Sequence, residues 1–231
     1  LEADLSLTLG QCLDELKLGK WFQNYYLLAM GGAIWSTPVS AMLEFPARTF
    51  IRFFDNHGLL TINSHPQWYT VKNGSREYVK RITEKFHDSI MVDCGAVRII
   101  RDKEGVKIYD SKGVLSHYDA VIFSCHADQA LRLIENPTDN EQAILSNFRY
   151  QSNRMVLHGD TNFMPKRKGA WASWVYLSEN QAEIGSPMSL SYWMNNLQPL
   201  KTDIPIIATL NPSKEPRKET IYDEYWFDHP V

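Results

Sequence analysis

The chain has 231 residues, of which 44% are hydrophobic and 22% charged, so an ordinary globular protein with an ample core is expected. A net charge of -3 without any basic block leaves no electrostatic case for nucleic-acid binding. No apolar run has the length of a transmembrane helix, and no signal peptide is visible. Cys12, Cys94 and Cys125 lack C-x-x-C spacing, which favours reduced thiols and a cytoplasmic location.

Residues 1–66 are predicted to be mainly helical. Thr8 and Gln11 fit a capping box, in which each side chain accepts a hydrogen bond from the other residue's backbone. An apolar face with helical spacing follows at Leu9, Cys12, Leu13 and Leu16. Thr37-Pro38 predicts a further helix start, with proline at the first helical position, and Pro46 predicts another helix that ends at Gly58.

Aromatic side chains are dense in this helical region, and they have two interpretations. Apolar stripes with helical spacing are most often packed core. The alternative is the wall of an apolar substrate cavity, for which Trp35 and Phe54 are the candidates.

Residues 67–135 are predicted to form a second segment. A short strand at 69–72 leads to Asn73-Gly74, where asparagine tolerates the left-handed backbone of a tight turn. Ser75 then caps a helix that is expected to run to Phe86, with an inner face made of Val79, Ile82 and Phe86.

A β-meander is predicted at the centre of this segment. Residues 97–101 form a β-branched run, Val106 and Ile108 alternate with polar residues, and Gly105 and Gly113 fall where the turns belong. The meander ends in residues 120–123, an unbroken apolar run typical of a strand buried on both faces. A helix is expected over 128–134. Open α/β sheets bind ligands at the carboxyl end of a strand that is buried on both faces. The residues that follow the run at 120–123 are Ser124, Cys125 and His126.

Residues 136–231 are predicted to form a helix and a sheet. The helix covers 139–148 and directs Ile144, Leu145 and Phe148 inward. Strands without intervening helices predict a largely antiparallel sheet, with one face covered by the helices of residues 1–60. The expected strands are 154–158, 170–176, 189–194, 204–210 and 221–227. The predicted fold class is therefore α+β, with a mixed, largely antiparallel sheet.

Few residue patterns indicate a specific chemistry. The histidines have no metal-ligand spacing, so no metal site is predicted, and neither G-x-S-x-G nor a P-loop occurs. His126 is the best single candidate for a cofactor contact, although a histidine at a strand end is often only hydrogen-bonded. Asp160 either orients a polar group or caps the turn at Thr161-Asn162. Trp171 and Trp193 need not share a cavity, because alternate strand positions face opposite sides.

Several segments together resemble the flavin-containing amine oxidase superfamily, in a bacterial branch of predicted NAD/FAD-binding proteins. They are the turn at 73–75 with its helix, the V-x-x-I strand at 97–100, the D-x-V-I strand at 119–122, and LHGDTNFMP, AWASW and YWMNNLQPL. The resemblance implies an FAD-dependent oxidoreductase with a flavin-domain segment at 67–135 and a substrate domain from 1–66 and 136–231. It places Val97 against the adenine of FAD, and Ser124, Cys125 and His126 beside the dinucleotide.

The resemblance also implies that this chain is an internal fragment of its parent protein. The superfamily holds the FAD pyrophosphate with G-x-G-x-x-G, and no G-x-G occurs here, so the fragment is expected neither to retain FAD nor to be active alone.

A lysine typical of many flavin amine oxidases is replaced by Arg154 or Met155, depending on the alignment. The missing lysine argues against amine oxidation, and the aromatic helices, if they line the cavity, suit a long, lipid-like apolar substrate. Contact with a membrane surface is expected for such a substrate. The alternatives are a true amine oxidase and a non-redox binding module. The expected substrate-cavity residues are Trp35, Phe54, Arg154, Met155, Trp174 and Trp193.

Overall fold

The computed structural model describes residues 7–35, 37–61, 63, 66–176 and 189–230. The chain divides into two compact units, one made of residues 1–77 and 152–229 and the other of residues 78–151 and 230–231. Helices and antiparallel sheets are both present, which confirms the predicted α+β class. Among the described helices, none combines the length and the apolar character needed to cross a bilayer.

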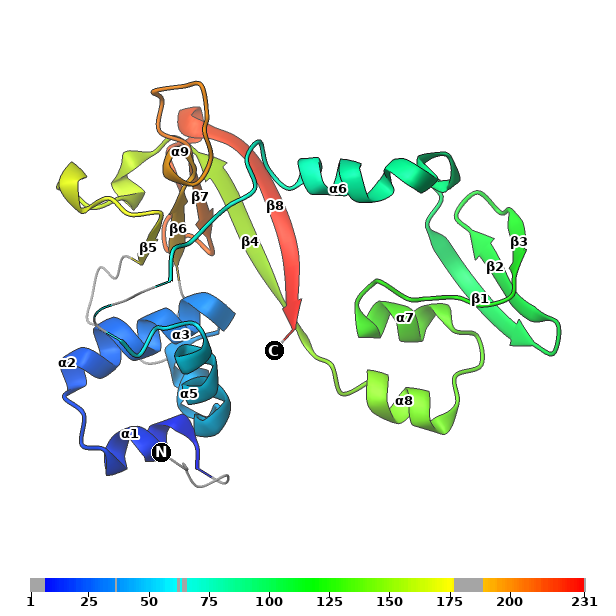
Figure 1. Cartoon of the computed structure of the whole chain (residues 1–231), viewed down its shortest axis with the longest axis horizontal. Helices are drawn as coiled ribbons and strands as arrows, with labels where there is room; N and C mark the ends of the chain where they lie inside the picture. The colour runs from blue at the N-terminus through cyan, green and yellow to red at the C-terminus, as the bar shows by residue number, and fades with distance from the viewer. Residues whose placement is uncertain (1–6, 36, 62, 64–65, 177–188, 231) are drawn as a thin grey trace. The chain divides into compact units, whose positions relative to one another are not determined.

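Short helices make up the first part of the first unit (Figure 1). Thr8 caps the first of them with the predicted capping box, its hydroxyl accepting from the Gln11 N–H at 3.3 Å. Pro38 is itself the cap of the helix that follows it, so the predicted Thr37 cap is wrong by one residue. The elements are α1 (Leu9–Glu15), α2 (Lys20–Phe22), the π-helical η1 (Gln23–Leu27), α3 (Leu28–Trp35), α4 (Val39–Leu43) and α5 (Ala47–Asn56).

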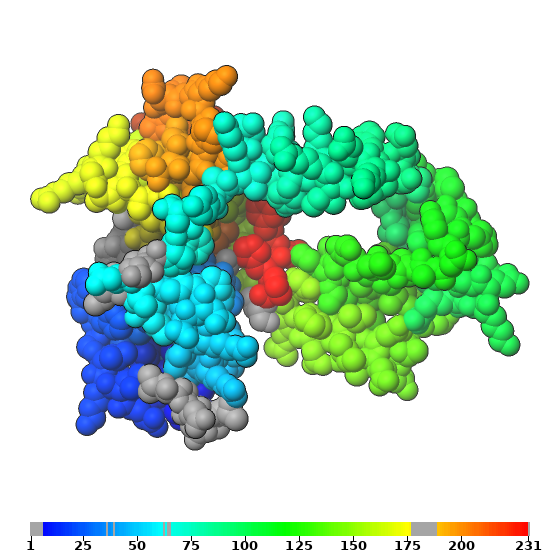
Figure 2. Space-filling view, viewed as in Figure 1, coloured from blue at the N-terminus to red at the C-terminus, as the bar shows by residue number. Residues whose placement is uncertain are grey.

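The apolar faces of these helices meet in one core. Phe50 and Phe54 are buried there with their rings stacked at 4.1 Å between centroids. Trp35 is partly buried and packs against Phe45 and Phe53, at 4.9 and 4.8 Å. Figure 2 shows the atoms of α1 to α5, blue to cyan, as one continuous mass. The remaining buried members are Leu9, Leu13, Leu27, Leu28 and Met42.

A five-stranded sheet with the order β5-β6-β7-β4-β8 completes the first unit. Each of the predicted strands is present, and the pairs β5/β6, β6/β7 and β4/β7 are antiparallel. The strands are β4 (Tyr150–His158), β5 (Trp174–Tyr176), β6 (Leu190–Trp193), β7 (Ile207–Leu210) and β8 (Ile221–Pro230). Short helical turns lie between them at η3 (Thr161–Phe163), η4 (Lys168–Ala170), α9 (Met194–Leu197) and η5 (Lys218–Thr220).

Helix α3 packs against this sheet, as the sequence predicted for the helical region. Ala33 of α3 is buried together with Leu190 of β6 and Leu210 of β7. Met155, Tyr176 and Tyr192 pack around these three residues from β4, β5 and β6. The contact places residues 157 and 177 positions apart in the chain against one another.

The second unit contains the predicted meander, with strand order β1-β2-β3. Ile99 and Ile108 lie directly opposite each other in its antiparallel register. Gly105 and Gly113 have φ values of 131° and 79°, which confirms their turn positions, and Asn73 has the expected left-handed φ of 69°. The strands are β1 (Ala96–Asp102), β2 (Gly105–Asp110) and β3 (Leu115–Tyr118), and the helices are α6 (Arg76–Thr83), η2 (Glu84–Ser89), α7 (Ala127–Leu133) and α8 (Asp139–Leu145).

Replacing Gly105 with alanine is expected to destabilise the meander by about 1–3 kcal/mol. A Cβ at this position would lie 2.5 Å from the backbone oxygen of Tyr118, in addition to the strained φ. Gly113→Ala is the matched control, because its φ is also positive but no atom lies within 4 Å of the added Cβ. Urea unfolding should show a clearly larger loss for Gly105→Ala, and equal losses would mean that the Tyr118 contact does not matter.

Two predicted strands are wrong. Residues 69–72 and 120–123 have no strand conformation, and Ile122 is 90% exposed although the run was expected to be buried on both faces. An apolar run becomes a buried strand only when neighbouring strands supply backbone hydrogen-bond partners. In the described residues, no strand pairs with either segment.

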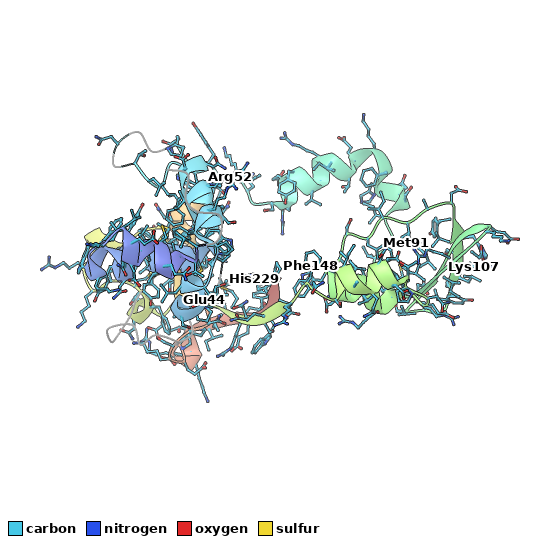
Figure 3. The ribbon with its side chains drawn as sticks, turned by 90° about the horizontal axis from the view of Figure 1, so that it is seen from below. Glu44, Arg52, Met91, Lys107, Phe148 and His229 are labelled. Atoms are coloured by element: carbon cyan, nitrogen blue, oxygen red, sulfur yellow. The ribbon has the colours of Figure 1, made fainter. Side chains whose placement is uncertain are left out.

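Two predicted inward faces are also wrong. Val79, Ile82 and Phe86 are exposed on α6 and η2. The predicted helix to Phe86 is α-helical up to Thr83 and continues past Phe86 as the 3₁₀ helix η2. Ile144 on α8 and Phe148, just after α8, are exposed, and Figure 3 labels Phe148. An apolar stripe identifies the face that a helix can bury, but burial also requires a covering surface. Within the described part of the second unit, no such surface covers these side chains.

Candidate functional site

A pocket of about 550 Å³ lies within the second unit. It is formed by β1, β2, the segment that follows the meander, and α7. Its volume is in the range of small-molecule sites in proteins. The lining residues are Ala96, Ile99, Ile108, Val121, Ile122, Phe123, Ser124, Cys125, Gln129, Arg132 and Leu133.

One side of the pocket is an apolar wall held by the meander. Ile99 is 3% exposed and lies opposite Ile108 on the neighbouring strand, so both side chains are on one face of the sheet. The Glu135 N–H donates to the Ile99 carbonyl at 3.0 Å, which ties the end of α7 to β1. The wall is therefore fixed by strand pairing on one edge and by the helix connection on the other.

Polar groups lie around this wall. Ser124 and Cys125, two of the predicted cofactor residues, line the pocket and are exposed. Gln129 and Arg132 reach it from α7, and the Arg132 guanidinium donates to Asp128 at 2.7 Å one helical turn away. An apolar wall beside a hydroxyl, an amide and a guanidinium can hold a flat heteroaromatic group and hydrogen-bond its edge.

His126, the third predicted residue, is engaged at the start of α7. Its ring stacks on Tyr150 with centroids 4.3 Å apart and planes 13° apart. The Tyr150 hydroxyl accepts from the Ala127 N–H at 2.8 Å, so the two aromatic residues fix the helix start together. His126 is not among the residues that line the pocket, and its contact with a cofactor stays a prediction.

Val97 lies at an irregularity in the meander. The register of β1 and β2 shifts between Ala96 and Arg98, so Val97 has no partner in the β1/β2 register, and its side chain is 55% exposed. A residue exposed in this way can contact a ligand, and its proposed contact with adenine remains to be tested.

The sequence predicted only part of this pocket. The alternation of apolar residues in the meander contained the signal for Ile99 and Ile108, because it puts them on one face. Gln129 and Arg132 gave no such signal, since polar residues on an exposed helix are ordinary. The pocket offers an apolar slot with hydrogen-bonding groups at its rim.

The expected substrate-cavity residues lie in separate clusters of the first unit. Trp35 and Phe54 pack in the helical core, and Met155 packs between the sheet and α3. Trp174 meets Tyr192 edge-on at 5.6 Å. Trp193 contacts Trp171 with ring centroids 5.2 Å apart and planes at 90°, although alternate strand positions provided no reason to expect this contact. Their role in binding a substrate stays a prediction.

Arg154 is held by two glutamates. Its guanidinium donates to Glu215 at 2.6 and 3.0 Å and to Glu224 of β8 at 3.1 and 2.9 Å. The hydrogen bonds to Glu215 and then Glu224 raise the pKa of Arg154 above its already high value. This residue therefore stays protonated and paired.

A buried polar chain runs behind the end of β4. The Asp160 N–H donates to His158 Nδ1 at 3.1 Å, and His158 Nε2 lies 2.8 Å from the Thr209 hydroxyl. Burial lowers the pKa of His158 to about 4, so the ring is neutral at pH 7. Asp160 caps the turn by accepting from Asn162, and it also accepts from the Arg217 N–H, so one carboxylate serves both expected roles.

Comparisons with known proteins relate the whole chain to three enzymes by fold. No family model and no curated protein matches the sequence. Among solved structures, the chain is similar to a CLA-producing fatty acid isomerase from P. acnes, with 13% identity and a TM-score of 0.59 over 96% of this chain and 54% of that one. It is also similar to reduced UDP-galactopyranose mutase, with 14% identity and a TM-score of 0.57 over 99% of this chain and 57% of that one. A putrescine oxidase variant with redesigned cofactor binding is similar with 11% identity and a TM-score of 0.60, over 91% of this chain and 45% of that one. The chain spans about half the length of these proteins, and the likeness shows a flavoprotein fold.

Proposed function

We propose that this chain is the central part of an FAD-dependent oxidoreductase that oxidises or desaturates an apolar, lipid-like substrate. One observation carries the proposal: Ser124 and Cys125 line a pocket against the wall of Ile99 and Ile108, in a chain with a flavoprotein fold. The second unit would hold the adenine end of FAD there. The chain alone would not retain the cofactor.

When bound, FAD would supply the hydride acceptor, and the protein would supply orientation and electrostatics. The residues of this chain would contribute the slot for the adenine, and Gln129 and Arg132, which line the pocket, would hydrogen-bond its edge. Arg154 is fully engaged by Glu215 and Glu224, so it would act as a fixed charge and not as a base.

An apolar substrate is supported by the side chains around β4 and α3. Met155, Tyr176 and Tyr192 gather there around Ala33, Leu190 and Leu210. A fatty acid isomerase is among the proteins of similar fold, which is consistent with a lipid-like substrate. The similarity to a putrescine oxidase favours the second candidate, an amine oxidase. We propose a cytoplasmic protein that meets its substrate at a membrane surface.

Substituting Cys125 with phenylalanine is expected to reduce FAD retention at least about tenfold, because the larger side chain fills the adenine slot. The measurement is the flavin absorbance per protein of a version extended at both ends, after purification and dialysis. Cys94→Phe is the matched control, since Cys94 belongs to the same unit but does not line the pocket. Equal flavin content in both variants would remove the adenine slot from the proposal.

The same extended protein identifies the substrate class. It is mixed anaerobically with a panel of unsaturated fatty acids and isoprenoids and a panel of primary amines and polyamines, and bleaching of the flavin band is followed. Bleaching by lipids supports the proposal, and bleaching by amines alone establishes the amine oxidase. A colourless protein that binds an apolar ligand would establish the non-redox binding module.

A further inference from the structure

A second pocket, of about 490 Å³, lies within the first unit and has no part in the proposed flavin site. It is bordered by the segment after β4, the start of β6 and the segment after β7. Its lining has an apolar side and a polar side, and the two together indicate which ligand the pocket can hold.

The apolar side of the pocket contains Met164, Pro165 and Trp171. Met164 is buried with Val175 of β5 and Ile207 of β7, and the Trp171 ring packs against this cluster. The Trp171 indole N–H donates to the Pro165 carbonyl at 2.8 Å, so the only polar group of this side chain is already satisfied. The Trp171 ring therefore offers the pocket apolar surface alone.

A buried chain of hydrogen bonds reaches the polar side of the pocket at Ser191, which is 3% exposed. Because His158 Nδ1 accepts from the Asp160 N–H, the neutral ring carries its proton on Nε2 and donates to the Thr209 hydroxyl. Thr209 is fully buried, and its only other side-chain partner in the described part of the chain is the Ser191 hydroxyl, at 2.8 Å.

The direction of the Thr209–Ser191 hydrogen bond follows from the cost of the alternative. If Ser191 donated, the Thr209 hydrogen would be buried without an acceptor, and folded proteins avoid such uncompensated desolvation. Thr209 therefore donates, and the Ser191 hydroxyl keeps its own hydrogen. Among the described residues no other group accepts that hydrogen, so it is directed to an acceptor in the pocket.

The segment that borders the pocket after β4 is basic. Lys166, Arg167 and Lys168 follow one another and are all exposed, and residues 161–176 contain no acid. Lys168 lies over the Trp171 ring, 5.9 Å from its centre, whereas Lys166 lines the pocket. Where the structure describes the chain, Lys166 forms no ion pair, so its charge can pair with a ligand.

The other charged groups nearby are already engaged. Lys214 also lines the pocket, but its ammonium group lies 5.7 Å from the centre of the Phe163 ring, so we do not count it as a ligand donor. Asp160 and Glu215, which flank the lining segments in the sequence, each accept hydrogen bonds from an arginine. Lys166 is therefore the one charged side chain of the described lining that is left for a ligand.

From these observations we infer that the pocket binds the carboxylate of an aliphatic monocarboxylic acid, with Ser191 and Lys166 as donors and the chain against Met164 and Trp171. A carboxylate only accepts hydrogen bonds and carries a single negative charge, which matches one lysine and one hydroxyl donor. A phosphate monoester carries about -1.5 to -2 at pH 7, so one lysine would leave part of its charge unpaired. The inference goes beyond the proposed function, and it stands or falls separately because the pocket does not involve FAD.

Titration calorimetry of the 231-residue chain with octanoate at pH 7 tests the site without any flavin. Saturable one-to-one binding is expected. 1-Octanol keeps the chain but lacks the charge, and acetate keeps the carboxylate but lacks the chain. Each should therefore bind at least about tenfold more weakly than octanoate.

Lys166→Gln and Ser191→Ala are each expected to weaken octanoate binding about tenfold, because each removes a hydrogen bond to a charged group. Lys112→Gln is the control, since Lys112 is an exposed turn residue of the second unit, and it should leave binding unchanged. Lys166 is exposed, so its variant keeps the test valid even if Ser191→Ala lowers stability. The inference is overturned if octanoate does not bind, if either analogue binds equally well, or if Lys166→Gln binds octanoate as tightly as Lys112→Gln.

Discussion

Replacing Phe50 with alanine is expected to lower the free energy of unfolding by about 3–5 kcal/mol. Phe50 is 2% exposed, stacks on Phe54 at 4.1 Å between ring centroids, and lies 5.8 Å from Trp35. The truncation removes a buried ring and leaves a cavity that the fixed helices around it close only in part. Urea unfolding followed by far-ultraviolet circular dichroism measures the loss.

Phe148→Ala is the matched control, because it makes the same chemical change at a side chain that is 51% exposed. Its effect should stay within about 0.5 kcal/mol. A Phe50 variant with an unchanged unfolding midpoint would show that the helical core does not hold this unit together. A large loss for Phe148→Ala would show that this side chain is covered in solution.

The strands of the sheet were predictable because their signals are local. Residues 154–158 and 221–227, for example, are β-rich runs bounded by polar or proline-bearing loops, and such runs need only one another to pair. The same holds for Gly105 and Gly113, whose positive φ values follow from the turns between short strands. The capping box at Thr8 and Gln11 involves only neighbouring residues and was likewise readable.

The wrong predictions share a different physical cause. Residues 120–123 and the apolar faces at Ile82 and Ile144 have the composition of buried structure, yet Ile122, Ile82 and Ile144 are all exposed. Composition reports what a segment can bury, whereas burial depends on which other segment reaches it. Local patterns contain no information about that second segment.

The predicted and the missed polar residues differ in the same way. Ser124 and Cys125 were predicted because the family resemblance pointed to the end of one segment. His158 was passed over, since a single histidine in a strand shows no spacing pattern. Only the folded sheet brings it against Thr209 and, through Thr209, against Ser191.

Lowering the pH from 7 to 4 is expected to destabilise the protein by about 3 kcal/mol through His158 alone. Burial lowers the pKa of His158 in the fold to about 4 from an ordinary value of 6.5. Between these two values the unfolded chain binds a proton that the folded protein does not take up. The contribution is therefore fully present above pH 6.5 and is lost as the pH falls toward 4.

Urea unfolding at several pH values between 7 and 4 measures this loss, and His158→Gln is the variant that isolates it. Glutamine can donate to Thr209 and accept from the Asp160 N–H, but it does not titrate, so its stability should be nearly flat over this range. The lowered pKa values of Asp160 and Glu215 reduce stability at more acidic pH, as these carboxylates become protonated. Equal slopes for the two proteins between pH 6.5 and 4.5 would show that His158 is not held neutral by burial.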